Sequence, residues 1–152
     1  MQDSDSEGLI ALIGGIWSTY DNVVLDVDRE EPWLRAPASS YAELGGRMWV
    51  VGEAPSACVA ARAVKGDAAA FELKSLYVDA SHRRQGLGQR LVRLVEAYVS
   101  ERGARRIVLW SDTKFLEAHQ FYAALGYART GGYRELGDLS GTAEYEFELR
   151  LV

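Results

Sequence analysis

The sequence predicts one α+β domain with a mixed, mostly antiparallel sheet and flanking helices, and three observations support this fold class. The chain of 152 residues, 48% apolar and 26% charged, has the length and composition of a single globular domain covering residues 1–152. β-prone runs stand on both sides of one strongly amphipathic helical segment. A run that is apolar at consecutive positions follows this helix, which is typical of a strand in a parallel pair.

The first part of the chain predicts a helix followed by an exposed loop. Apolar residues recur at helical spacing in residues 9–20, so we expect an amphipathic helix that covers one face of the sheet. Residues 21–37 place acidic side chains beside Pro32 and Trp33, a composition typical of an exposed loop. Residues 39–44 are expected to add a short helix.

Two β-prone runs at residues 47–53 and 57–64 predict a hairpin, because only the short connection 54–56 separates them. A third strand is expected at residues 71–78. The apolar side chains of this third strand change phase along its length, from odd positions at Phe71 and Leu73 to even positions at Leu76 and Val78. Because side chains alternate between the faces of a sheet, this slip predicts a β-bulge.

Residues 87–102 carry the clearest helical stripe of apolar side chains, and Gly103 marks the end of that helix. Residues 106–110 are apolar on both faces, so we expect them to run parallel to the third strand. A second helix is expected at residues 114–125, with Gly126 as its stop. Two closing strands are expected at residues 127–133 and 143–151.

A loop with two glycines and two arginines precedes the clearest helix and has the features of a phosphate-binding cradle. Free N–H groups at a helix start attract anions. Gly86 can adopt a positive φ, Gly88 lets a ligand approach the backbone, and Arg83 and Arg84 add positive charge. The spacing matches neither a nucleotide P-loop nor a dinucleotide fingerprint. Taken alone, the same residues could simply begin a helix.

These segments resemble the GNAT superfamily of acetyl-CoA-dependent N-acyltransferases. The family's signature, Arg/Gln-x-x-Gly-x-Gly/Ala between a strand and a helix, is matched at every fixed position by Arg83-Arg84-Gln85-Gly86-Leu87-Gly88. Residues 76–79 look like the family's fourth strand, and residues 118–127 resemble its later motif of Ala, Tyr, Gly and an aromatic residue. The resemblance is strong over residues 71–127. It implies a GNAT-like domain in which a bulge splays the parallel strand pair.

The resemblance also implies that acetyl-CoA is the cosubstrate. Backbone N–H groups of residues 84–88 would hold its pyrophosphate, whereas a role for the Arg83 side chain is left open. Many family members have Asn where this chain has Phe115, so that contact to the cofactor is either missing or supplied by Asp112 or Thr113. The implied cofactor-binding residues are Leu76, Tyr77, Val78, Arg83, Arg84, Gln85, Gly86, Leu87 and Gly88.

Transfer of an acyl group from a thioester to an amine needs a proton acceptor and a proton donor. The family pattern places Tyr122 near the CoA sulfur, where a phenol with a pKa of about 10 can protonate the leaving thiolate. Glu72 precedes the expected bulge and is the candidate base. The competing interpretations are that Tyr122 belongs to the apolar core and that Glu72 lies on a solvated strand face. A backbone N–H group in residues 76–78 is the candidate oxyanion donor.

The composition and the isolated polar residues exclude several other classes. A net charge of −5 argues against nucleic-acid binding, and Gly14 and Gly15 interrupt the only long apolar stretch near the N-terminus, so no membrane segment is expected. The single cysteine, Cys58, cannot form an intrachain disulfide, which favours a cytoplasmic protein. His82 and His119 have no metal-ligand neighbours at suitable spacing, so no metal is expected.

The expected partner is a small molecule or amino acid with a primary amine, acetylated directly and without a covalent enzyme intermediate. The acceptor site is expected in the loop at residues 26–33 and the closing segment 131–141. Two alternatives are a noncatalytic acyl-CoA sensor and a peptide or protein N-acetyltransferase. The sequence leaves the acceptor, the acyl-chain preference and a monomer or homodimer open.

Overall fold

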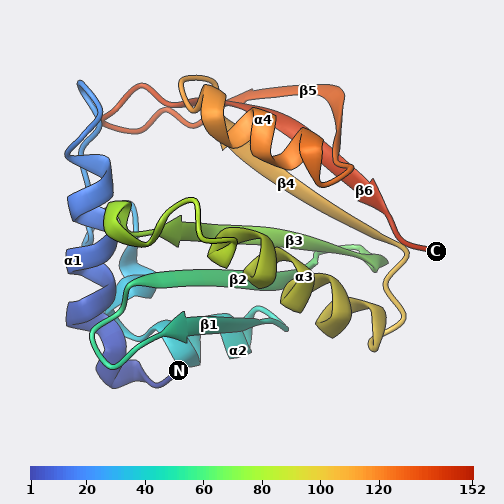
Figure 1. Ribbon diagram of the computed structural model, residues 1–152, viewed down its shortest axis with the longest axis horizontal. Helices are drawn as coiled ribbons and strands as arrows, with labels where there is room; N and C mark the ends of the chain where they lie inside the picture. Colours follow the sequence, from blue (N-terminus) through green and yellow to red (C-terminus); the bar gives the residue numbers. More distant parts are fainter.

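The computed structural model describes residues 1–152 as one six-stranded sheet with helices on both faces (Figure 1). The strand order is β1-β2-β3-β4-β6-β5, and β3 and β4 are the parallel pair. This mixed, mostly antiparallel sheet confirms the predicted fold class. The strands are β1 (Arg47–Val51), β2 (Ala57–Val64), β3 (Asp67–Val78), β4 (Arg106–Asp112), β5 (Ala128–Glu135) and β6 (Ala143–Arg150).

The helices form two layers, one on each face of the sheet. Alternate residues of β2 point to opposite faces, so Val59 belongs to the core under α3, whereas Cys58 belongs to the core under α1. In Figure 1, α3 and α4 lie in front of the strands and α2 lies behind β1. The helices are α1 (Ser6–Trp17), α2 (Pro37–Glu43), α3 (Leu87–Ser100) and α4 (Leu116–Ala124), with short 3-10 turns η1 (Asp3–Asp5), η2 (Pro32–Arg35) and η3 (Ala80–His82).

Most element boundaries agree with the sequence prediction to within two residues, and the largest differences are at the end of α1 and the start of β3. Helix α1 ends at Trp17 instead of residue 20, where the hydroxyls of Ser18 and Thr19 donate to backbone carbonyls of the last turn. Strand β3 begins at Asp67, earlier than expected, and the antiparallel ladder with β2 extends to that residue. The end of β3, which resembled a fourth strand, belongs to the third strand of this chain.

The predicted bulge in β3 is confirmed. Cys58 of β2 lies opposite Tyr77, but Ala60 lies opposite Lys74, so β3 contains one residue more than its partner over this stretch. Ser75 carries the irregularity, with a φ of 54°, which is uncommon for a residue other than glycine. The bulge therefore redirects the end of β3 beyond Lys74.

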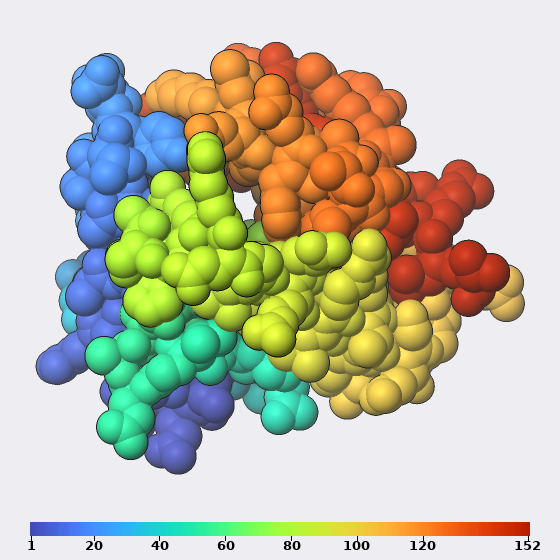
Figure 2. Space-filling view, viewed as in Figure 1, coloured from blue at the N-terminus to red at the C-terminus, as the bar shows by residue number.

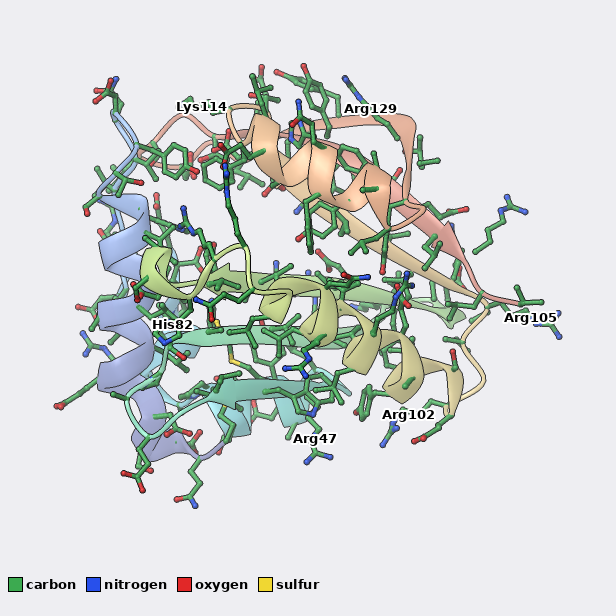
Figure 3. All side chains as sticks on the ribbon, in the orientation of Figure 1. Arg47, His82, Arg102, Arg105, Lys114 and Arg129 are labelled. Carbon is green, nitrogen blue, oxygen red and sulfur yellow. The ribbon has the colours of Figure 1, made fainter.

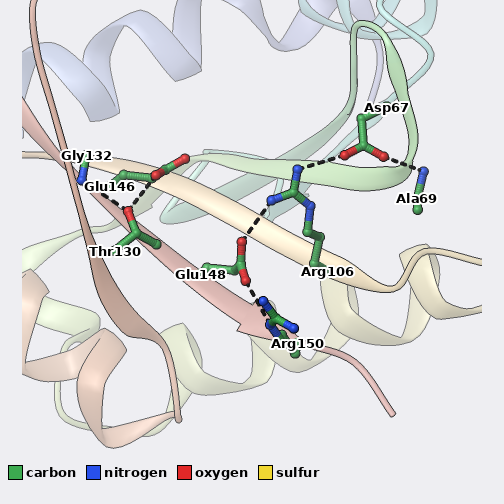
Figure 4. A network of polar contacts seen from close by, with 8 residues as sticks. All are labelled: Asp67, Ala69, Arg106, Thr130, Gly132, Glu146, Glu148 and Arg150. Carbon is green, nitrogen blue, oxygen red and sulfur yellow. Dashed lines mark hydrogen bonds and ion pairs between the residues drawn. The ribbon is translucent and has the colours of Figure 1, made fainter.

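The parallel strands are joined at one end and apart at the other. Register partners link β3 to β4 only from Ala70 to Glu72, and in Figure 1 the two strands then diverge towards α1. At the joined end, Arg106 of β4 contacts Asp67 of β3 at 2.7 Å and Glu148 of β6 at 2.9 Å (Figure 4). Beyond Glu72, the edge of β3 that faces β4 has no strand partner, which leaves an opening through the sheet.

Candidate active site

A groove lies on the α3 and α4 side of this opening. Its volume is about 610 Å³, and Figure 2 shows the hollow between the chain entering α3 and the orange α4. The end of β3, the loop before α3, and one side of α4 form its walls, and α1 closes one end. The lining residues are Ile16, Tyr20, Leu76, Tyr77, Val78, Arg83, Arg84, Gly88, Phe115, Glu117, Ala118, Gln120, Phe121 and Tyr122.

The loop before α3 presents a row of free backbone donors to this groove. None of the N–H groups of residues 84–89 donates to a backbone carbonyl or to a capping side chain, and Arg90 is the first residue to bond back, to the Gly86 carbonyl. Two left-handed residues shape the loop, Arg84 with a φ of 59° and Gly86 with a φ of 76°. Free amides beside the positive end of a helix dipole suit an anion such as a phosphate.

The side chains of the same loop divide between the groove and the protein. The Arg83 side chain lines the groove and also donates from Nε to the Val78 carbonyl at 3.0 Å, which ties the loop to the end of β3. Gln85 instead donates to the Ser81 carbonyl at 3.2 Å, and Leu87 packs against the core. Neither the Gln85 nor the Leu87 side chain lines the groove, so these residues face it only through their backbone.

Tyr122 lies both in the core and on the groove, so the two interpretations of its role are compatible in space. The side chain is 7% exposed and packs at 5.8 Å from the ring of Tyr127 and 6.3 Å from that of Phe147. Burial raises the pKa of Tyr122, and no neighbouring charge or hydrogen bond opposes that effect. The phenol is thus protonated at neutral pH.

A second, smaller cavity lies on the α1 side of the opening. Its volume is about 220 Å³, below the range of roughly 300 to 1,000 Å³ typical of sites for drug-sized ligands. Its walls come from α1, the loop after it, β3, β4 and the β5–β6 hairpin. The lining residues are Ile13, Trp17, Val23, Glu31, Trp33, Leu34, Glu72, Leu73, Lys74, Ser75, Tyr77, Trp110, Asp112, Phe115, Arg134, Leu136, Asp138, Thr142 and Glu144.

Glu72 lies in this cavity and not on a solvated face, so that competing interpretation is wrong. Its residue is 7% exposed, and Arg62 donates to Oε2 from Nε at 2.7 Å and from Nη2 at 2.6 Å. The other oxygen, Oε1, has only Lys74 nearby, at 3.8 Å from Nζ. The ion pair positions the carboxylate and leaves Oε1 for a ligand.

The groove and the cavity meet at the opening between β3 and β4. Tyr77 and Phe115 line both of them. The hydroxyl of Tyr77 accepts from Nε1 of Trp17 at 3.1 Å, and the ring of Phe115 lies 4.5 Å from that of Tyr20. Two aromatic pairs therefore lie where the groove with free backbone donors borders the cavity with carboxylates.

Of the alternatives left open for the missing Asn contact, Asp112 is not supported by the structure, because this residue lines the other hollow. Asp112 lines the cavity and is absent from the groove, where Phe115 provides an apolar wall instead. The cavity also takes Glu31 and Trp33 from the predicted loop, together with Asp138 from the predicted closing segment. The acceptor segments expected from the sequence thus come together around Glu72.

The cationic side chains do not gather on one surface. Figure 3 labels Arg47, Arg102, Arg105, Lys114 and Arg129, which lie along different edges of the molecule. No group of three or more His, Cys, Asp or Glu side chains is arranged to hold a metal ion. None of the helices has both the length and the apolar character needed to cross a bilayer.

The sequence was also compared with known protein families. The family profile described as "Acetyltransferase (GNAT) family" matches residues 14–127, well over half of the chain. The chain belongs to the GNAT acetyltransferase family. The matched range contains the whole groove and the end of β3 beside it.

Individual relatives agree with this family. Human N-acetyltransferase 8 is 28% identical over 120 residues, which cover 76% of this chain and 51% of that protein. The chain therefore spans about half the length of the curated relatives it matches. An acetyltransferase of the GNAT family from Staphylococcus aureus superposes with a TM-score of 0.77 at 22% identity, covering 98% of this chain and 94% of its own.

An aminoglycoside 6′-N-acetyltransferase crystallised with coenzyme A has a TM-score of 0.69 at 18% identity, covering 97% of this chain and 91% of its own. At such identities these structures show the shared fold alone. The architecture expected from the resemblance, a splayed parallel pair within a GNAT-like domain, is confirmed.

Sequence reasoning missed several residues that line the two hollows. Phe121 and Tyr20 in the groove, and Trp17 and Trp110 in the cavity, were assigned only to helices or strands. Their spacing along α1, α4 and β4 is that of ordinary core positions, so no local pattern distinguishes them. Only the packing of distant segments places them on a hollow.

Proposed function

We propose that this protein is an N-acetyltransferase that moves the acetyl group of acetyl-CoA to a primary amine of a small molecule. The observation that carries the proposal is the meeting of two chemically different hollows at one opening in the sheet. One presents free backbone donors and two arginines, and the other presents a positioned carboxylate. Such an arrangement brings a phosphate-bearing cosubstrate and an amine together from opposite faces.

The groove fits coenzyme A by three features of this chain. The free N–H groups of residues 84–89 suit the pyrophosphate, and Arg83 and Arg84 add charge beside them. The unpaired edge of β3 at Leu76 and Val78 offers backbone partners to the amide-containing pantetheine arm. When bound, acetyl-CoA supplies an activated acetyl thioester at the opening.

The residues around the opening supply the proton transfers. Glu72 would take a proton from the acceptor ammonium, through Oε1 or a bridging water, so that the nitrogen lone pair can attack. Tyr122 would deliver a proton to the leaving sulfur, and it regains that proton from solvent. A backbone N–H group near the bulge at Ser75 would stabilise the negative oxygen that develops during transfer.

Direct transfer fits better than a covalent enzyme intermediate. The only cysteine, Cys58, is fully buried, and burial raises the pKa of its thiol to about 12. A thiol that is neutral at physiological pH and closed to solvent is a poor nucleophile. The acetyl group would therefore pass from sulfur to nitrogen in one site.

A small acceptor fits better than a peptide or protein. The loop after α1 is joined to the β5–β6 hairpin by three hydrogen bonds. The Val24 N–H donates to Ser140 Oγ at 2.8 Å, the Ser140 hydroxyl donates to the Val24 carbonyl at 3.4 Å, and the Leu139 N–H donates to Glu30 Oε1 at 2.7 Å. These contacts close one side of the cavity. A volume of about 220 Å³ leaves room for a metabolite but not for an extended chain.

The direct test combines coenzyme A binding with turnover. An added Cβ at Gly88 would lie 3.4 Å from Phe121 and 3.8 Å from Val78, two groove residues, so Gly88→Val should block the groove. Gly88 does not have a positive φ, so the substitution should not strain the backbone. The matched control is Gly15→Val in α1, where an added Cβ meets no atom within 4 Å. Gly86 is less suitable, because its φ of 76° would strain any β-branched residue.

We expect coenzyme A at a hundred times its Kd to stabilise the wild type by about 2.7 kcal/mol, and Gly88→Val to lose that shift while the control keeps it. Release of free thiol from acetyl-CoA in the presence of an amine panel then separates an enzyme from a sensor. Binding without thiol release from any amine would favour the noncatalytic alternative. An unchanged thermal shift in Gly88→Val would contradict the groove assignment.

A further inference from the structure

We propose that the acceptor carries a second cationic group besides the amine that is acetylated, so that the substrate class is a short linear diamine. This inference rests on the proposed function and adds a second binding point to the same cavity. The cavity contains carboxylates that the protein leaves without an ion-pair partner, and one of them, Asp112, lies away from Glu72 along β4.

The charges that line the cavity are mostly negative. Its carboxylates are Glu31, Glu72, Asp112, Asp138 and Glu144, against the cationic side chains Lys74 and Arg134. Arg62 neutralises Glu72, and Arg134 binds Glu144 at 2.7 Å. Asp138 receives both the N–H and the hydroxyl of Thr142 within its own turn. Glu31, Asp112 and Asp138 have no ion-pair partner, and of these three only Asp138 has both oxygens engaged in hydrogen bonds.

Asp112 is the best placed of the unpartnered carboxylates. It is 7% exposed at the end of β4, and its Oδ1 accepts from the Lys114 N–H at 2.9 Å. No donor of the protein binds Oδ2. Every side-chain oxygen or nitrogen that is closed to solvent has a hydrogen-bond partner, so Oδ2, which has none, is accessible. Because Asp112 lines the cavity, Oδ2 is available to a ligand there. A buried carboxylate without a counter-charge is unfavourable, and an organic cation in the cavity would correct this.

Glu31 is a second carboxylate of the cavity without an ion-pair partner. Burial raises its pKa from the ordinary value, and the indole N–H of Trp33 and the charge of Lys74 oppose that effect only in part. A further cation in the cavity would favour the charged form of Glu31. The indoles of Trp33 and Trp110 also line the cavity, and aromatic rings are favourable neighbours for an ammonium group.

The two binding points are separated along the sheet. Glu72 is in register with Val108, and Asp112 lies further along β4, roughly 13 Å away at about 3.3 Å per residue. One ammonium group cannot reach both carboxylates at once. An acceptor with two nitrogens on a short chain can place one at Glu72 and the other near Asp112.

An amino acid that places its carboxylate near Asp112 fits this cavity less well than a diamine. The cations that could bind a carboxylate are already engaged, since Arg134 is paired with Glu144 and lies over the ring of Trp110 at 4.2 Å. Lys74 lies 3.8 Å from Glu72. The negative character at Asp112 and Glu31 would repel an anion.

The test uses three acceptors of equal chain length: diaminobutane, butylamine and aminobutyrate. With saturating acetyl-CoA, we expect the KM of diaminobutane to be at least about tenfold below that of butylamine, and aminobutyrate to be the poorest. Calorimetry of diaminobutane with the coenzyme A complex measures binding independently of turnover. Asp112→Asn should raise the KM and Kd of diaminobutane about tenfold and change those of butylamine less than about twofold.

The matched control is Asp28→Asn, which makes the same change in net charge at an exposed ion pair with Arg35, outside the cavity. It should leave all three acceptors unchanged. Glu31→Gln serves as the second variant, with the same expected selective loss, if Asp112→Asn does not fold. Equal KM values for butylamine and diaminobutane would overturn the inference while leaving amine acetylation intact. If no amine is acetylated, the proposed function fails, and the calorimetric comparison still decides whether the diamine is preferred.

Discussion

Removal of the Tyr122 hydroxyl tests the proposed proton donor with little disturbance of the fold. Tyr122→Phe keeps the ring that packs against Tyr127 and Phe147. The hydroxyl has no hydrogen-bond partner in the protein to lose, so the free energy of unfolding should change by less than about 0.5 kcal/mol. The chemical step should slow by about 10²-fold or more, the range typical of a general acid.

The assay is the single-turnover rate of acetyl transfer together with the Kd of acetyl-CoA, measured for wild type and variant. We expect the rate to fall and the Kd to stay within about twofold, because the hydroxyl would act mainly during transfer. Tyr127→Phe is the matched control. Its ring lies 5.8 Å from that of Tyr122, but its hydroxyl faces Glu96 at 3.5 Å and does not line the groove.

The pH dependence gives a second readout of the same group. Burial raises the pKa of Tyr122, so its protonated form persists as the pH rises. The wild-type rate should therefore rise as the acceptor ammonium loses its proton and should show no descending limb up to about pH 10. A Tyr122→Phe rate within about threefold of wild type would refute the assignment and leave solvent as the proton donor.

Two further changes test other parts of the structure. Glu72→Gln should reduce turnover about tenfold or more at neutral pH, and its turnover should recover as the pH rises, because the free amine then needs no base. A pH profile parallel to that of wild type would exclude Glu72 as the general base. Arg106 lowers the pKa of Asp67, so their ion pair contributes stability above the ordinary value of 3.8 and loses it as the pH falls through the lower folded-state value. Asp67→Asn should therefore flatten the dependence of Tm on pH in that acid range, and an unchanged slope would show that the contact at the joined end of the strands is not stabilising.

The sequence by itself determined the order of the elements and the position of the cradle, because both depend on local patterns. The stripe of α3 and its stop at Gly103 need only helical periodicity, and Gly103 has the positive φ of 79° that such a stop requires. The phase slip predicted the bulge at Ser75 for the same reason, since alternation along one strand is visible in the sequence. The free donors of residues 84–89 follow from a loop that runs directly into a helix.

Only the tertiary structure decided which side chains share a hollow. The sequence left Glu72 between a catalytic base and a residue on a solvated strand face, and the structure pairs it with Arg62 of β2 inside the cavity. Asp112 was one candidate for a contact to the cofactor, and it lines the cavity instead of the groove. Glu31 reaches the same cavity from a loop far away in sequence. Such contacts depend on how strands separate and how distant loops fold back, and no spacing within one segment encodes them.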